Sequence, residues 1–288
     1  VDEGILAKTT AFAKIEAFAD DAGTTAPAPT VADYALANIA GVTAENLLAV
    51  NTRLKADNSI PGNALTNAQI DAAVADADAR LAQFENNTPT SPATAFTKAD
   101  YEAIGITGVS DTVVDPANSV DGTDNLLAVN AQIARAATND ANSTLDIQWA
   151  VARANAAIAS IEAYNNGTLG RELTIDDYAA VGINGVVPDD IHSINEEASI
   201  NSVLALNSVS EIQGLVDSGK RSLQSAIAAI YRTSKGETPA ATVEQLKRLG
   251  LSSLTDAEIT TSSLSSIHKV MADYYLSDPS YLGSTAQA

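Results

Sequence analysis

Apolar and polar residues are arranged along this chain in a way that favours short helices, and one such segment recurs. It opens with threonine, has an acidic or amide residue three positions later, and then a large apolar residue. This order is typical of a capping box, in which the threonine hydroxyl and the third side chain bond to backbone amides of the first helical turn. Four residues after the apolar position stands Asn or Gly, which tolerate the left-handed conformation that ends a helix. The pattern therefore predicts a two-turn helix with both ends specified.

Four copies of this capped-helix motif are present, and their apolar positions are 67, 77 and 68 residues apart. The copies begin at Thr30, Thr97, Thr174 and Thr242. Their apolar residues are Tyr34, Tyr101, Tyr178 and Leu246, and their last residues are Asn38, Gly105, Gly182 and Gly250. Repeated tyrosines can be exposed anchors for a partner. The leucine in the last copy favours packing in the core instead.

A second helix is predicted after each motif, and in the first copy we expect it to begin at Thr43. The words NLLAVN occur at 46–51 and 125–130, with HSIN at 192–195 as a weaker third copy. Asparagine is a poor residue for the interior of a helix. We therefore expect Asn51, Asn130 and Asn195 to make hydrogen bonds that tie this helix to a neighbouring loop. The second copy has twelve extra residues before its asparagine, which predicts an insertion at 110–121 forming a surface loop.

A third, longer helix follows in each complete copy. Capping boxes begin at Thr66, Ser143 and Ser208, and apolar residues follow at steps of three and four. Such spacing puts the apolar residues on one face of a helix of about twenty residues, or roughly 30 Å. The segment 5–21 resembles the end of another long helix, so we expect the sequence to open inside a repeat.

These elements predict an all-α fold of tandem three-helix-bundle repeats, each with two short helices and one long helix, joined into an elongated rod. A continuous solenoid is the competing geometry. We expect a partial repeat at 1–28, complete repeats at 29–88, 89–168 and 169–236, and an atypical terminal repeat at 237–288.

Composition and charge narrow the range of partners. Hydrophobic residues make up 45% of the chain, and the net charge is −20. So acidic a chain is not expected to bind nucleic acid or anionic membranes, and the absence of any apolar run of about 18 residues predicts no membrane insertion. The residues from 219 onward carry a net charge of +1, against −21 for those before. This asymmetry suggests self-association, in which the last repeat docks on the acidic part of another copy.

Motifs for catalysis are missing from the sequence. The chain contains no cysteine, no nucleophile elbow and no phosphate-binding glycine loop, so we expect no enzyme activity, no small-molecule substrate and no cofactor. The two histidines, His192 and His268, lie in different repeats and are expected to have ordinary structural roles. Trp149 is expected to be partly exposed, because it lies one residue off the apolar face of its helix.

One group of residues could bind a metal ion. Carboxylates cluster near the insertion, and oxygen ligands on a loop are what Ca²⁺ uses. The spacing does not match a known calcium loop, so a solvated acidic loop is the favoured interpretation and calcium the alternative. The four carboxylates are Asp111, Asp115, Asp121 and Asp124.

The words TxxDYAAVGINGV and NLLAVN, with the SxxEIQ start of the third helix, resemble the alanine-rich tandem helical repeats of very large secreted or surface proteins of aquatic gram-negative bacteria. The resemblance covers about residues 11–235. It implies a non-enzymatic, adhesin-like structural region, extracellular or at the cell surface, that acts as spacer, adhesive stalk or self-assembling element. The alternatives are a subunit of an ordered surface layer or extracellular filament, and a helical module that binds a host or cell-surface protein.

Overall fold

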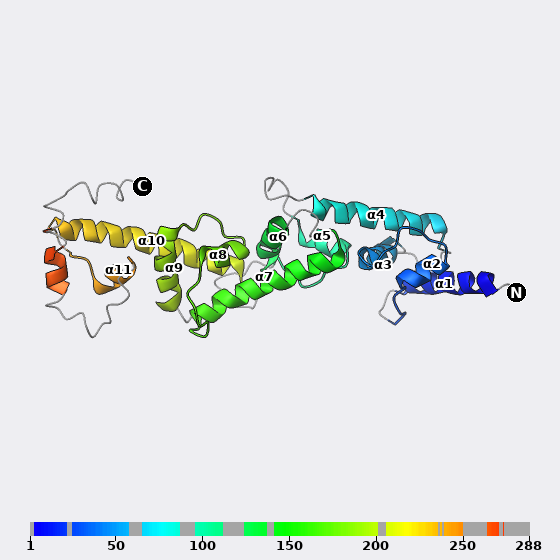
Figure 1. The fold of residues 1–288 in the computed structure, drawn as a ribbon, viewed down its shortest axis with the longest axis horizontal. Helices are drawn as coiled ribbons and strands as arrows, with labels where there is room; N and C mark the ends of the chain where they lie inside the picture. The colour runs from blue at the N-terminus through cyan, green and yellow to red at the C-terminus, as the bar shows by residue number, and fades with distance from the viewer. Residues whose placement is uncertain are drawn as a thin grey trace. The chain divides into compact units, whose positions relative to one another are not determined.

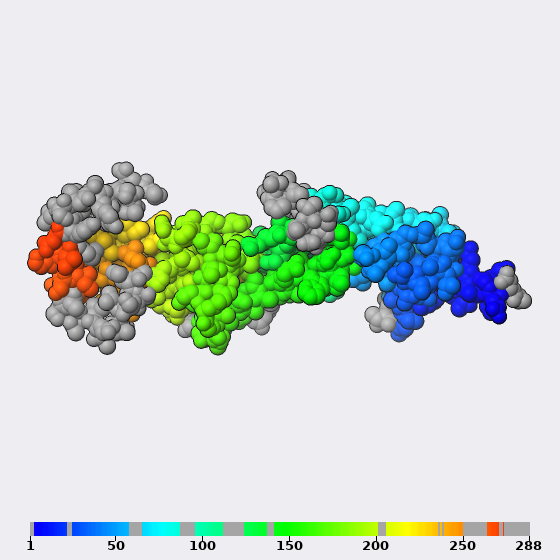
Figure 2. All heavy atoms as spheres, viewed as in Figure 1, coloured from blue at the N-terminus to red at the C-terminus, as the bar shows by residue number. Residues whose placement is uncertain are grey.

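The computed structural model of the protein describes residues 3–21, 25–57, 65–86, 96–111, 124–136, 141–200, 206–235, 237, 239–249, 264–270 and 273, which are drawn in colour in Figures 1 and 2. All regular secondary structure in these ranges is helical, as the sequence predicts. None of these helices is both long enough and apolar enough to cross a membrane.

The helices follow one another in the order long, short, medium along most of the chain (Figure 1). The chain folds into two compact units, Val1–Ala156 and Ala157–Ala288. The labelled helices are α1 (Glu3–Asp20), α2 (Val31–Leu36), α3 (Leu47–Asp57), α4 (Asn67–Glu85), α5 (Lys98–Ala103), α6 (Leu126–Arg135), α7 (Thr144–Asn165), α8 (Ile175–Ala180), α9 (Pro188–Ile200), α10 (Val209–Ser234) and α11 (Val243–Lys247).

Both ends of the capped-helix motif form as predicted. At the start of α2, the Thr30 amide donates to Asp33 Oδ2 at 2.7 Å and the Asp33 amide donates to Thr30 Oγ1 at 3.3 Å. The same reciprocal pair caps α5 and α11, and the Thr174 amide donates to Asp177 at the start of α8. The end residues lie in the left-handed region, with φ of +63° at Asn38, +80° at Gly105 and +86° at Gly182. Gly250 lies outside the described residues.

The second helix of the first copy is predicted to begin at Thr43, and one hydrogen-bonded turn does begin there, in which the Leu47 amide donates to the Thr43 carbonyl at 3.0 Å. Regular helix α3 follows from Leu47. The side chain of Asn46 accepts from the Thr43 amide at 2.8 Å and donates to the Gly41 carbonyl at 2.8 Å. Asn46 thus reaches back three residues, as the third residue of a capping box does, and ties the start of the helix to the preceding loop.

The long helices α4, α7 and α10 carry the predicted apolar stripe, and their buried residues recur at steps of three and four. Capping boxes start α4 at Thr66 and α10 at Ser208, and Ser143 and Asp146 bond to each other at the start of α7. In the N-terminal unit, α3 packs on α4, and α1 packs on α2 and α3. The core residues of the stripe are Ile70, Val74, Ala77, Leu81 and Phe84 in α4, and Ile147, Val151, Ala154, Ile158 and Ile161 in α7.

An aromatic cluster covers the start of the second motif. Phe96, which precedes the capping threonine, stacks on Phe84 of α4 with ring centroids 3.9 Å apart, and it meets Tyr101 edge-on at 6.1 Å. Phe96 and Tyr101 thus form a hydrophobic staple, in which the residue before the capping threonine packs on one in the helix, and Phe84 of the preceding long helix contributes a third ring.

In the C-terminal unit, α9 runs across α10 and packs closely on it (Figure 1). The close approach depends on Gly219, because a Cβ at this position would lie 2.7 Å from Cα of Ile194. At the same point, the Ser193 hydroxyl donates to the Gly219 carbonyl at 2.9 Å. Backbone contact of this kind fixes how α9 lies on α10, and α11 packs on α10 further along.

Candidate functional site

Each motif tyrosine pairs with the predicted asparagine of the following helix. Tyr34, Tyr101 and Tyr178 are fully buried. Their hydroxyls donate to Oδ1 of the asparagine at 2.6, 2.7 and 3.0 Å, and burial raises the pKa of each tyrosine well above its ordinary value. The three pairs are Tyr34 with Asn51, Tyr101 with Asn130, and Tyr178 with Asn195.

The amide nitrogen of each asparagine holds the loop before the motif. Asn51 donates to the Pro29 carbonyl at 3.1 Å, Asn130 to Phe96 at 2.9 Å, and Asn195 to Leu173 at 2.9 Å. In all three copies the acceptor is the residue directly before the capping threonine. The predicted tie to a neighbouring loop is thus confirmed. The three tyrosines and three asparagines hydrogen-bond to one another and to the backbone, and Asn195 also donates to Glu172 at 3.1 Å, so these residues support the fold.

A second hydrogen-bonded position holds the loop after the motif. Asn46 bonds Asp78 of α4 at 2.7 Å, and Asn125 bonds Asn155 of α7 at 2.7 Å. Like Asn46, Asn125 also donates to a glycine carbonyl in its loop, that of Gly108, at 2.7 Å. The third copy uses an ion pair at the matching positions, with Lys220 3.4 Å from Asp190 and bonded to the Gly185 carbonyl at 2.7 Å.

Two of the four candidate calcium ligands belong to the described residues. Asp111 is exposed and Asp124 is half-buried, while Asp115 and Asp121 lie outside the described residues. Within the described ranges, no three carboxylate or histidine side chains come together as a metal-binding group. Calcium binding by this cluster stays a prediction.

The two ends of the insertion meet. The Asn125 amide donates to the Ser110 carbonyl at 3.1 Å, and the Ser110 amide donates to Asn125 Oδ1 at 2.8 Å. The side chain of Asn125 thus accepts from a backbone amide of the loop after its motif, as that of Asn46 does in the first copy, although only the second copy has an insertion in this loop.

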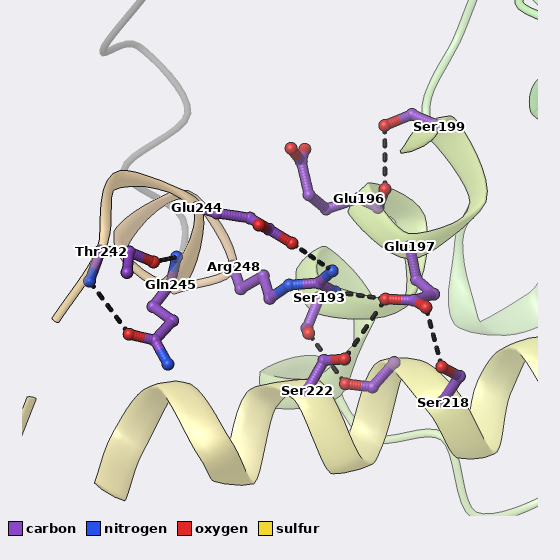
Figure 3. A network of polar contacts seen from close by, with 11 residues as sticks. Ser193, Glu196, Glu197, Ser199, Ser218, Ser222, Thr242, Glu244, Gln245 and Arg248 are labelled. Atoms are coloured by element: carbon purple, nitrogen blue, oxygen red, sulfur yellow. Dashed lines mark hydrogen bonds and ion pairs between the residues drawn. The ribbon is translucent and has the colours of Figure 1, made fainter. Parts of the chain in front are cut away.

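A buried polar network joins α9, α10 and the end of α11 (Figure 3). The Glu197 carboxylate accepts hydrogen bonds from Ser218 at 2.7 Å, from Ser222 at 3.3 Å and from the guanidinium of Arg248 at 2.5 Å. Arg248 also reaches Glu244 at 3.0 Å. Burial alone would raise the pKa of Glu197, but the bonds from Ser218 and Arg248 outweigh it and hold the pKa below its ordinary value.

Both histidines bond to backbone carbonyls. Nε2 of His192 lies 2.8 Å from the Lys247 carbonyl, and Nε2 of His268 lies 2.8 Å from the Ala241 carbonyl. These contacts agree with the structural roles expected from the sequence. His192 and Glu197 both connect α9 to the α11 region.

A groove of about 650 Å³ lies between the end of α6 and the start of α7, in the N-terminal unit. Trp149 and Leu145 are 61% and 64% exposed, which confirms the expected exposure of the tryptophan. The α6 wall consists of Gln132, Arg135 and Ala136, and the α7 wall of Leu145, Asp146, Trp149 and Arg153. The groove thus combines large apolar side chains with two guanidinium groups.

Sequence reasoning missed this groove and the Glu197 network, although the sequence holds a signal for the groove. Aligning the third helices on their capping boxes puts Trp149 opposite Ala72 and Gly214, and Leu145 opposite Ala68 and Ser210. The second copy therefore differs from the others at two surface positions.

Comparison with known proteins gives no relative of this chain. No family model matches it, no curated protein matches it, and no solved structure matches it.

Proposed function

We propose that this chain is a non-enzymatic structural region of tandem three-helix repeats, extracellular or at the cell surface, which acts as a spacer or adhesive stalk. The observation that carries the proposal is the threefold recurrence of the tyrosine–asparagine pair with the same loop contacts. Because this hydrogen-bonded pair occurs in every complete copy, we assign it to stabilising the fold that the copies share. Catalysis, by contrast, needs one specialised constellation.

Contacts between successive motifs support the same proposal. α3 of the first copy packs on α5 of the second, where Leu48 and Thr52 lie against Gly105. α9 of the third copy bonds to the fourth through His192 and Glu197. Repeats that bury surface against their neighbours form extended arrays, since each one needs only the next for support. The location at the cell surface is supported by the resemblance of sequence described above.

Small-angle X-ray scattering with light scattering tests the proposal. A compact domain of 288 residues has a radius of gyration of about 19 Å. A spacer of stacked repeats should scatter as a monomeric rod with a clearly larger radius, unchanged between 0.1 M and 1 M salt. A radius near the compact value contradicts the proposal. Oligomers that dissociate into monomers in high salt would favour self-assembly through the C-terminal repeat instead. A change in size or mass on adding Ca²⁺ alone would implicate the Asp111–Asp124 cluster.

A further inference from the structure

The turn between α8 and α9 contains an asparagine where its two counterparts do not. In each of these turns a glycine lies in the left-handed region, with φ of +84° at Gly41, +82° at Gly108 and +81° at Gly185. The residues directly before these glycines are Ala40, Thr107 and Asn184. Because the same turn forms after alanine and after threonine, its backbone does not require the asparagine.

Asparagine followed by glycine is the residue pair in which the main chain attacks a side chain most readily. The backbone nitrogen of the second residue can close a cyclic imide on Cγ of the asparagine, and glycine has no Cβ to obstruct the approach or to restrict the backbone. Asn184 is exposed, and a Cβ at Gly185 would meet nothing within 4 Å. The turn therefore offers both the residue pair and the space for this reaction.

The reacting groups of this pair are weakly held. Within the described part of the chain, no acceptor bonds the Gly185 amide. The Asn184 side chain makes one long contact, in which Nδ2 donates to the Gly182 carbonyl at 3.4 Å in an exposed position. Water competes well for a bond of this length. Neither the attacking nitrogen nor the side-chain amide that it attacks is thus fixed by the fold.

A second asparagine–glycine pair, Asn166 and Gly167, follows α7 and provides a comparison. Both residues are exposed, and a Cβ at Gly167 would also meet nothing within 4 Å. Here, however, the Gly167 amide donates to the Tyr164 carbonyl, and the Asn166 amide donates to the Glu162 carbonyl, each at 2.9 Å. Because the attacking nitrogen must leave its acceptor and lose its proton, this turn has to open before it can react. Hydrogen bonding, rather than crowding, separates the two pairs.

We propose that Asn184 and Gly185 form a site of spontaneous modification, at which the asparagine converts to isoaspartate. The Gly185 nitrogen gives its proton to hydroxide and bonds to Cγ of Asn184. The bond from Cγ to Nδ2 breaks, and Nδ2 takes a proton from water and leaves as ammonia. Water then opens the cyclic imide at either carbonyl, which gives aspartate or isoaspartate. The net reaction consumes one water and releases one ammonia, and it does not depend on the spacer function.

Isoaspartate changes this turn more than aspartate does, because its main chain runs through the side-chain carbon and is one carbon longer. Ile183 and Val186 on either side are both buried, so the exposed turn between them has to take up the added length. The Gly185 carbonyl, which accepts from Lys220 Nζ of α10 at 2.7 Å, then moves away from that donor. Lys220 retains its pair with Asp190, but the turn loses its tie to α10.

Mass spectrometry of the whole chain after incubation in mildly alkaline buffer tests the proposal. Trypsin puts Asn166 and Asn184 into different peptides, 154–171 and 172–220, and fragmentation locates the modified residue. In the folded chain we expect conversion at Asn166 to be at least about tenfold slower than at Asn184. In urea strong enough to unfold the chain, the two rates should become similar. An isoaspartyl methyltransferase, which methylates isoaspartate but not aspartate, distinguishes the two products.

Two variants complete the test. Asn184→Thr puts the residue of the second copy into this turn, and it should remove the conversion there while leaving the melting curve unchanged. Asn184→Asp adds the charge of the product without the longer main chain. We expect the purified isoaspartate form to melt at a lower temperature than the unmodified chain, and Asn184→Asp to melt at the same temperature as the unmodified chain.

Three results would overturn the proposal. The first is a folded chain in which Asn184 converts no faster than Asn166, which removes the role assigned to the free Gly185 amide. The second is a product that is aspartate alone, since a cyclic imide opens at both of its carbonyls. The third is an isoaspartate form that melts with the unmodified chain, which means that the longer main chain does not release the turn from α10.

Discussion

The hydroxyl of Tyr178 donates to Oδ1 of Asn195 at 3.0 Å, between two residues seventeen positions apart that are both buried. Replacing Tyr178 by Phe leaves Oδ1 without this donor, and we expect a loss of about 1–2 kcal/mol in the free energy of unfolding. Asn195→Ala also leaves the buried Leu173 carbonyl without its donor, so the loss in the free energy of unfolding should be larger, about 2–4 kcal/mol. Urea unfolding followed by circular dichroism measures both.

Tyr164 provides the control for this pair. Its hydroxyl bonds Glu172 at an exposed position, where water can replace the lost partner. Tyr164→Phe should therefore change the unfolding free energy by less than about 0.5 kcal/mol. If Tyr178→Phe costs no more than this control, the buried pair does not stabilise the fold.

Gly105 joins two successive motifs. Its φ is +80°, and a Cβ would press on Thr52 Oγ1 and lie 2.9 Å from Leu48 Cγ. Gly105→Ala should cost about 2–4 kcal/mol, because it adds a clash to left-handed strain. Gly185→Ala is the matched variant, with φ of +81° and nothing within 4 Å, and should cost about 1–2 kcal/mol. Equal losses for the two variants would mean that α3 does not press on this turn.

The two glycines of α10 should respond in opposite directions. A Cβ at Gly219 would meet the backbone of Ile194, so Gly219→Ala should destabilise the chain by about 1–3 kcal/mol and loosen α9. Nothing lies within 4 Å of a Cβ at Gly214, and Gly214→Ala should stabilise by about 0.5–1 kcal/mol through helix propensity. Thermal melts of both variants are the measurement. A stabilising Gly219→Ala would be incompatible with the close helix contact.

Acid should weaken two helix starts. A hydrogen bond from Lys14 lowers the pKa of Asp33 to about 2, and one from Arg171 lowers that of Asp177 to about 2, with the capping threonines helping in both cases. Because these values lie below the ordinary 3.8, the stabilisation is complete above about pH 4 and is lost as the pH falls towards 2.

Unfolding midpoints between pH 5 and pH 2 measure this loss. Arg171→Gln should move the pKa of Asp177 back towards 3.8 and so reduce the stability lost below pH 4. Asp177→Asn should remove that contribution to the acid loss. An acid profile that is the same in all three proteins would show that the Asp177 pair contributes nothing to stability.

Local features of the fold could be predicted from the sequence because they depend on residues a few positions apart. A capping box spans four residues and a left-handed end is one Asn or Gly, so each start and stop is encoded where it occurs. The buried stripe of α4 follows from spacing in the same way. The turn that leads into α3 is local as well, because the Leu47 amide donates to the Thr43 carbonyl and the Asn46 side chain accepts from the Thr43 amide.

Contacts between distant positions were harder to predict. The side-chain tie of Asn51 was expected, but its pairing with Tyr34 was not, since the corresponding distance in the second copy differs by twelve residues. The network around Glu197 requires that Arg248 of the next motif comes close, which depends on the packing of α9, α10 and α11. Spacing within one copy cannot reveal such a contact.

The hydrogen bonds between Ser110 and Asn125 have a consequence for how the sequence can change. The residues between them begin and end at one hydrogen-bonded point, so their number does not alter the register of the helices on either side. Doubling the length of a flexible loop costs only about 0.6 kcal/mol. This position is therefore a natural graft point, where foreign peptides or whole domains could be spliced into the chain and displayed from it.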